Sequence, residues 1–227
     1  MTPGPASAPS LTGEANLREA IVQAARHLSA LGLSPGSSGN LSVRLGDSIL
    51  ATPTGASLRN VQPADLALVG SEPNDSAPLS AADGPRPTKE LPLHRAMYDE
   101  RPDAAAVIHL HSPYSTAIAC LPPDRDGFAA LPNLTPYRVM RLGPVPIAAY
   151  AAPGSEDLAA SVRKHAAAHA VLLLANHGPV VAAPTLDAAI DLIEELETAA
   201  QLTLLLRQAP AVALTDEAVA TLRPPGH

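Results

Sequence analysis

The segment AVIHLHSPYSTAIACL, residues 106–121, joins a short apolar run to an H-x-H pair and then to a helical pattern. The apolar run 104–108 predicts a buried strand that ends at His109. Pro113 suits the first turn of a helix, so a helix is predicted over 112–121. A buried strand followed at once by a helix is typical of a sheet that is covered by helices.

Helical and extended patterns alternate on both sides of this segment. Apolar residues recur at helical spacing over 14–31, and Gly32 is expected to end that helix. Further helices are predicted over 89–100, 155–168, 186–208 and 216–222, and strands over 41–45, 48–51, 66–69, 145–150, 171–175 and 180–182. The polar, proline-rich segment 70–88 is expected to be a surface loop. The alternation indicates an α/β or α+β fold in one domain, 13–227, after a disordered extension over 1–12.

The composition of the chain excludes several classes of function. Its 22 acidic residues outnumber its 15 lysines and arginines, and the net charge of −7 argues against non-specific nucleic-acid binding. With four Tyr, one Phe and no Trp, a platform for stacking bases is equally unfavourable. No apolar stretch approaches the roughly 18 residues of a membrane-spanning helix, and residues 1–10 lack a signal-peptide pattern. We therefore expect a cytoplasmic protein without a nucleic-acid or membrane partner.

Histidine and carboxylate, rather than cysteine, are the metal-binding groups that this chain offers. Cys120 is the only cysteine, which excludes a cysteine-based zinc site, and we expect it to be a small buried hydrophobic residue. Residues i and i+2 of an extended chain point to the same side, so His109 and His111 converge while Leu110 points away. An H-x-H pair also arises by chance, and further ligands are needed before it indicates a metal.

Two further residues supply such ligands. His177 ends a second predicted strand and precedes Gly178, which allows close backbone approach, and Glu90 opens a predicted helix. Three histidines with one carboxylate suit Zn²⁺, with Mn²⁺ or Co²⁺ as alternatives. The simpler interpretations are a turn residue for His177 and a carboxylate that complements the helix dipole for Glu90. The remaining histidines are interpreted as helix-surface or tail residues, with contact with the site as the alternative for His94: His27, His94, His165, His169 and His227.

Loops rich in glycine and hydroxyl groups suggest a phosphate pocket. The runs 37–40 and 52–55 follow or precede predicted strands, where backbone N–H groups can bind a phosphate, although such loops are often ordinary turns. Thr88 and Lys89 stand just before Glu90 at a helix start, and together they offer a hydroxyl, a cation and a helix N-terminus to an oxyanion.

Taken together, these segments resemble the class II aldolase/adducin family from about Leu17 to Gln208, in both their order and their spacing. The resemblance lies in SGNLSVR (38–44), ATPTGASL (51–58), PTKELPLH (87–94), AVIHLHSPYSTAIACL (106–121) and LLLANHGPVV (172–181). It implies an α/β fold with three α-β-α layers, in which a central, mainly antiparallel sheet has helices on both faces. It also implies a homotetramer.

The resemblance also implies roles for individual residues. His109, His111 and His177 match the family's metal ligands, and Glu90 matches its acid/base, which can also touch the metal. Tyr137 aligns loosely with a tyrosine that reaches the site from a neighbouring subunit. The residues that match the phosphate pocket are Gly39, Asn40, Thr54, Gly55, Thr88 and Lys89. The last two stand where sugar-phosphate aldolases have paired serines.

Within the family, residues 133–159 are most similar to decarboxylases of 3-oxo-tetronate 4-phosphate. This similarity implies a divalent-metal-dependent carbon–carbon lyase of acid-sugar catabolism, which forms dihydroxyacetone phosphate and CO₂ through a metal-stabilised enediolate. The alternatives are an aldolase acting on a sugar phosphate such as L-fuculose 1-phosphate and, less favoured, a pentulose-phosphate 4-epimerase. A non-catalytic, adducin-like interaction module is the alternative from another class, and the retained histidines and Glu90 count against it.

Overall fold

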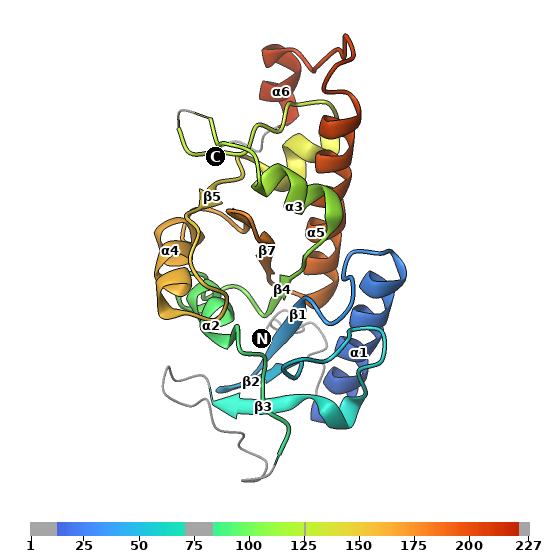
Figure 1. The fold of residues 1–227 in the computed structure, drawn as a ribbon, viewed down its shortest axis with the longest axis vertical. Coiled ribbons are helices and arrows are strands. Elements are labelled where there is room, and N and C mark those ends of the chain that lie inside the picture. The colour runs from blue at the N-terminus through green and yellow to red at the C-terminus, as the bar shows by residue number, and fades with distance from the viewer. Residues whose placement is uncertain (1–12, 71–83, 125, 223–227) are drawn as a thin grey trace, which may run out of the picture.

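The computed structural model describes residues 13–70, 84–124 and 126–222, and its centre is a seven-stranded sheet with the order β3-β2-β1-β4-β7-β6-β5 (Figure 1). Neighbouring strands are antiparallel except for β5 and β6, which are parallel. The strands are β1 (Asn40–Leu45), β2 (Ser48–Ala51), β3 (Ala67–Gly70), β4 (Ala106–His109), β5 (Ile147–Ala148), β6 (Val171–Leu174) and β7 (Gly178–Ala183). The helices are α1 (Glu14–Ala30), α2 (Leu91–Glu100), α3 (Pro113–Ala119), α4 (Glu156–Ala166), α5 (Leu186–Leu205) and α6 (Asp216–Leu222), with a 3₁₀ turn at Pro63–Asp65 and a π turn at Arg138–Leu142.

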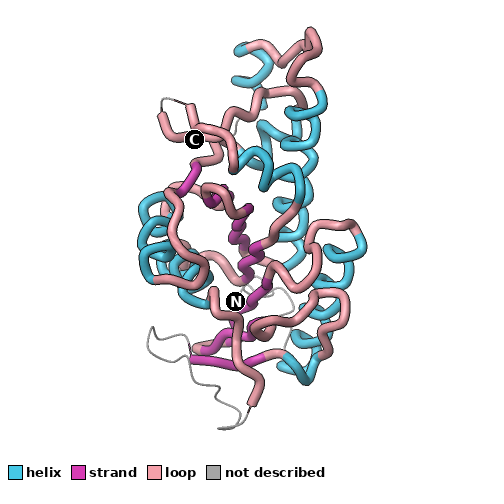
Figure 2. Tube along the Cα trace, viewed as in Figure 1, coloured by secondary structure: helices cyan, strands magenta, loops and turns pink. Residues whose placement is uncertain are grey.

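Helices cover both faces of the sheet, so the predicted three-layer architecture is confirmed. In Figures 1 and 2, α2 and α4 lie on one side of the strands, and α1, α3 and α5 lie on the other. Two apolar cores fill the space between the layers. Ala106 and Ile108 of β4 point into the core under α1 and α5, whereas Val107 points into the core under α2 and α4. Because both faces are buried, the central strands have continuous apolar sequences.

The elements begin and end close to the predicted positions, with a few differences. The strand expected over 145–150 is only the two-residue β5, since Pro146 has no N–H to donate to a sheet partner. Pro92 stands in the first turn of α2, and this helix begins at Leu91 rather than at Lys89. Gly32 follows the end of α1 with a φ of 79°, as expected for a helix stop. The predicted extension over 1–12 and most of the predicted loop over 70–88 lie outside the described residues.

The prediction that Cys120 is buried is wrong. Cys120 follows the last residue of α3 and is exposed. The buried stripe of α3 contains Ser115, Ile118 and Ala119, and one further residue turns the chain by about 100° away from that stripe. Among the described residues, no helix combines the length and the apolar character that crossing a bilayer requires.

Candidate metal centre

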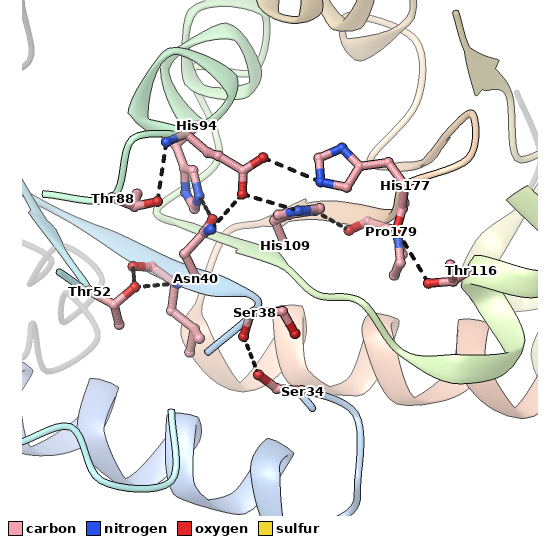
Figure 3. A network of polar contacts seen from close by, with 12 residues as sticks. Ser34, Ser38, Asn40, Thr52, Thr88, His94, His109, Thr116, His177 and Pro179 are labelled. Carbon is pink, nitrogen blue, oxygen red and sulfur yellow. Dashed lines mark hydrogen bonds and ion pairs between the residues drawn. The ribbon is translucent and has the colours of Figure 1, made fainter. Parts of the chain in front are cut away.

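The centre lies where β4, the turn between β6 and β7, and the start of α2 meet. His109 is the last residue of β4, and His111 follows two positions later. His177 lies in the turn after β6, which ends at Leu174, so it does not end the strand as predicted. Glu90 is the N-cap of α2. Figure 3 shows His109 and His177 side by side, although the sequence separates them widely.

The predicted ligands converge on one point. The ring centres of His109 and His111 are 5.1 Å apart. The ring centre of His177 lies 4.7 Å from that of His109 and 4.8 Å from that of His111. One ligand atom of each histidine and of Glu90 lies within 4.8 Å of all the others. The Nε2 atoms of His109 and His177 are each 3.4 Å from an oxygen of Glu90. Two ligands of a tetrahedral zinc ion, each about 2.1 Å from the ion, are themselves about 3.4 Å apart.

The nitrogen and oxygen atoms of these side chains that lack a hydrogen-bond partner are also suited to binding a cation. The Nδ1–H group of His109 donates a hydrogen bond of 2.8 Å to the carbonyl of Pro179, which leaves Nε2 as the lone-pair atom. The Nε2 atoms of the three histidines and Oε1 of Glu90 are buried and have no hydrogen-bond partner among the described residues. Four such donors that face one another are suited to a divalent metal, and their chemistry is compatible with Zn²⁺, Mn²⁺ or Co²⁺.

The surroundings keep the three imidazoles neutral. Burial is the first cause that lowers the pKa of His109, His111 and His177, and the effect on His109 is the strongest. Neighbouring histidines lower the pKa of His109 further. At His111 and His177 the Glu90 carboxylate raises the pKa and Lys89 lowers it, and burial is the largest effect, so both pKa values stay lowered. Neutral imidazole is the form that binds a metal, so the electrostatics of the site favour metal binding at neutral pH.

A pocket of about 290 Å³ opens beside the centre and contains all six predicted phosphate-pocket residues. Three loops and the start of α2 line it, together with His111 and His177. Gly39 has a φ of 81°, and a Cβ there would lie 3.2 Å from the carbonyl oxygen of His109. This glycine therefore lets its loop approach the metal centre closely. The predicted lining residues are Gly39, Asn40, Thr54, Gly55, Thr88 and Lys89.

Sequence reasoning missed part of this lining. Pro153 lines the pocket from the loop before α4, and the adjacent Gly154 packs against the backbone of Lys89, where a Cβ would lie 2.7 Å from the carbonyl oxygen. No local motif marks Pro153, because only the packing of distant loops brings it there. Asn40 and Thr88 are buried, and the carboxamide of Asn40 donates to Oε2 of Glu90 over 2.9 Å. The side chain of Asn40 therefore contacts the metal centre as well as the pocket.

The interpretation of His94 as a surface residue is wrong, and the alternative is confirmed. His94 is completely buried and contacts Asn40, which in turn contacts Glu90. Burial is the main cause that lowers the pKa of His94 to about 3, so its ring is neutral at physiological pH. His169 lies beyond the end of α4 and packs edge-on against Phe128, whereas His27 is exposed as predicted.

Tyr137 does not reach the centre of its own chain. Its side chain is 60% exposed, and it lines a separate surface pocket with Arg141 and Asp191. Its contribution to a neighbouring subunit's site stays a prediction.

Replacement of Gly178 by alanine is expected to destabilise the fold around the centre. A Cβ at this position would collide with the carbonyl oxygen of Leu110, which belongs to the backbone and cannot rotate away. We expect a loss of about 2–3 kcal/mol in the free energy of unfolding, as for other overpacked sites, measured by chemical denaturation. Gly46→Ala is the control, since a Cβ there meets no atom within 4 Å. Its positive φ should cost only about 1 kcal/mol, and equal losses for the two variants would contradict the expected collision.

The fold and the site together define the class of this protein. The family described as Class II Aldolase and Adducin N-terminal domain matches residues 19–204, and the chain belongs to this family.

Within this family, the chain is similar to proteins of two different activities and to a solved structure. The chain is 41% identical over 211 residues to a 3-oxo-tetronate 4-phosphate decarboxylase of Escherichia coli strain K12, covering 92% of this chain and 96% of that protein. It is 30% identical over 210 residues to an L-fuculose phosphate aldolase of the same strain, covering 91% and 92%. The crystal structure of YgbL from Escherichia coli matches with a TM-score of 0.86 at 40% identity, over 93% of this chain and 99% of that one.

Proposed function

We propose that this protein is a divalent-metal-dependent decarboxylase that converts 3-oxo-tetronate 4-phosphate to dihydroxyacetone phosphate and CO₂. The observation that carries the proposal is the four-residue donor cluster beside a pocket that contains Lys89. The name of the 41% identical relative gives the substrate class. The predicted cytoplasmic location and homotetramer belong to the same proposal.

The residues of the centre suit this reaction. His109, His111, His177 and Glu90 would hold the cation, which supplies Lewis-acid stabilisation of the negative charge that develops on the substrate's carbonyl oxygen. The bond between C1 and C2 of the substrate breaks, CO₂ leaves, and the electron pair stays on C2 in conjugation with the C3 carbonyl. One proton must then reach C2. Glu90 is the one carboxylate among the described residues that line the pocket, so we assign this proton transfer to Glu90.

The pocket offers groups that match the two negative ends of such a substrate. Lys89 is an exposed cation at the pocket and stands beside the metal ligand Glu90. The loops around Gly39 and Gly55 present backbone to the same space, and backbone N–H groups in such loops bind phosphate. A substrate with both a carboxylate and a phosphate carries one more negative group than a ketose phosphate does. Lys89 would neutralise that additional charge.

A sugar-phosphate aldolase is the second candidate. The observation in its favour is the 30% identity to an L-fuculose phosphate aldolase over nearly the whole chain. In both reactions a carbon–carbon bond breaks and the fragment that stays behind keeps the electron pair as an enediolate. The departing fragment is CO₂ in the decarboxylase and an aldehyde in the aldolase. An aldehyde needs a proton on its departing oxygen, which is the role that the resemblance gives to Tyr137 of a neighbouring subunit. CO₂ needs none.

A product assay separates the two candidates. Purified protein with added Zn²⁺ or Mn²⁺ would be given 3-oxo-tetronate 4-phosphate or L-fuculose 1-phosphate in parallel reactions. We expect CO₂ and dihydroxyacetone phosphate from the first compound, without any aldehyde. Cleavage of the ketose phosphate while the oxo acid stays intact would overturn the decarboxylase in favour of the aldolase.

Replacement of Lys89 by serine is expected to weaken binding of the acid substrate. The loss of one charged hydrogen bond should raise its KM by about tenfold or more, with a smaller effect on binding of L-fuculose 1-phosphate as a competitive inhibitor. Steady-state kinetics would measure both values. Lys164→Ser is the matched control, because Lys164 is exposed on α4 and is not part of the pocket. Equal losses for the two compounds would contradict the proposed charge neutralisation.

A further inference from the structure

A line of hydrogen bonds runs from Glu90 into the core between β1 and α2. The amide nitrogen of Asn40 donates to Oε2 of Glu90 over 2.9 Å, and its carbonyl oxygen lies 2.5 Å from Nε2 of His94. Nδ1 of His94 lies 2.7 Å from Oγ of Ser42, which is 2.9 Å from the hydroxyl of Tyr98. All five side chains are buried (Figure 3 shows Asn40 and His94).

The side chains of this line come from one face of the strand β1 and from one face of the helix α2 with its N-cap. Asn40 and Ser42 are residues i and i+2 of β1 and therefore share one face of the strand. His94 and Tyr98 are four residues apart in α2 and share one face of the helix, and Glu90, the N-cap, stands four residues before His94 at the end of that face. The carboxamide of Asn40 sits between two successive helical positions. Because Asn40 also pairs with His109 in the sheet, its backbone is fixed relative to the metal centre.

The donors and acceptors in this line have only one consistent order. A carboxylate accepts hydrogen bonds, so the amide nitrogen of Asn40 faces Glu90 and its carbonyl oxygen faces His94. That oxygen cannot donate, so His94 must carry its proton on Nε2. The neutral ring then accepts at Nδ1 from the hydroxyl of Ser42, and the oxygen of Ser42 accepts from Tyr98. The carboxylate thus fixes the orientation of the Asn40 amide, and the Nε2–H tautomer of His94 is the one that holds the amide in that orientation.

We propose that His94 is a positioning residue for the metal ligand Glu90, acting through the carboxamide of Asn40. Each carboxylate oxygen lies 3.4 Å from Nε2 of one histidine, Oε2 from that of His109 and Oε1 from that of His177. The amide of Asn40 holds Oε2, whereas Oε1 has no hydrogen-bond partner among the described residues. His94 thereby assigns the two carboxylate oxygens to different tasks, with Oε2 anchored and Oε1 directed to the cation. This inference rests on the metal role of Glu90 within the proposed function, and it does not depend on which substrate the protein takes.

Co²⁺ binding without substrate tests the proposal, because it reports the ligand field directly. In His94→Gln the amide nitrogen of Gln takes the place of Nε2 and can still donate to Asn40, whereas the shorter side chain of His94→Asn reaches only the place of Nδ1. We expect His94→Gln to bind Co²⁺ within about threefold of the wild-type affinity. His94→Asn should bind it about 10–100 times more weakly, with a changed visible spectrum, as is typical for loss of an outer partner of a metal ligand.

Two further measurements separate the ways in which the proposal fails. Glu90→Gln is the reference variant, and unchanged Co²⁺ affinity and spectrum in it would show that Oε1 is no ligand, which also overturns the role of His94. A weakened Glu90→Gln alongside a wild-type His94→Asn would overturn the positioning role alone. If His94→Asn does not fold, nitrogen NMR of the wild-type His94 ring decides: a proton on Nε2 is expected, and a proton on Nδ1 alone contradicts the proposal.

Discussion

His109→Ala is expected to release the metal from the protein and to abolish its activity. The side chain of His109 is completely buried, its Nδ1 is anchored on Pro179, and its Nε2 faces the other three ligands. Water cannot readily take the place of the ring, because His109 is the last residue of the buried strand β4 and its side chain is not exposed to solvent. Loss of an outer partner of a ligand costs about 10–100-fold in metal affinity, so loss of the ligand itself should cost more than about 100-fold.

Metal content per chain after gel filtration, measured by plasma emission, tests this expectation. The wild-type protein loaded with Zn²⁺ should retain about one ion per chain, and His109→Ala about a tenth of that or less. His27→Ala is the control, because this exposed histidine on α1 pairs with Glu194, which is not part of the donor cluster. A His109→Ala protein that is folded and retains as much metal as the wild type would falsify the ligand assignment.

Glu90→Gln is expected to lower kcat by about 10²–10⁴-fold, the usual contribution of a general acid or base. Glutamine has the shape of glutamate, and its carbonyl oxygen can still accept the hydrogen bond from Asn40. It cannot transfer a proton at neutral pH. The three histidines remain, so the variant should still bind metal at raised concentration, and the loss of rate can be measured on loaded protein.

Steady-state rates at saturating metal test this second expectation. Glu100→Gln is the matched control, because it makes the same change at the far end of the same helix. This control should have the wild-type kcat. If loaded Glu90→Gln retains more than about a tenth of kcat, the proton must come from another group or from water, and the role of Glu90 is limited to the metal.

Much of the site follows from local sequence. The alternation of side chains along a strand is enough to place His109 and His111 together and Leu110 in the opposite core, and the structure confirms both. Pro92 marks the start of α2 because its ring fixes φ, and the glycines mark the loops that line the pocket because they adopt positive φ without strain. His177 and Glu90 were candidates from local sequence alongside simpler interpretations, and resemblance to a family singled them out as ligands and supplied the layer order.

Features that depend on packing between distant elements were not predictable in this way. A histidine within a helical pattern is indistinguishable in sequence from a residue on the helix surface. Only the packing of α2 against β1 places His94 beside Asn40. Cys120 is apolar by type, but it stands one residue beyond a buried stripe. Pro153 contributes to the pocket because its loop packs on Lys89, a contact between chain segments that no local pattern encodes.

The four proposed ligands come from three segments: the start of α2, the end of β4 and the turn between β6 and β7. An ion held by all three is therefore a cross-link of the native fold as well as part of the chemistry. The unfolded chain, in which these segments are far apart, binds that ion poorly. At a free metal concentration 100 times the dissociation constant, such linkage adds about 2.7 kcal/mol to the stability of the folded state. An occupied site would thus couple the thermal stability of this protein to the concentration of free metal, and the metal-free chain would be less stable and more sensitive to proteases.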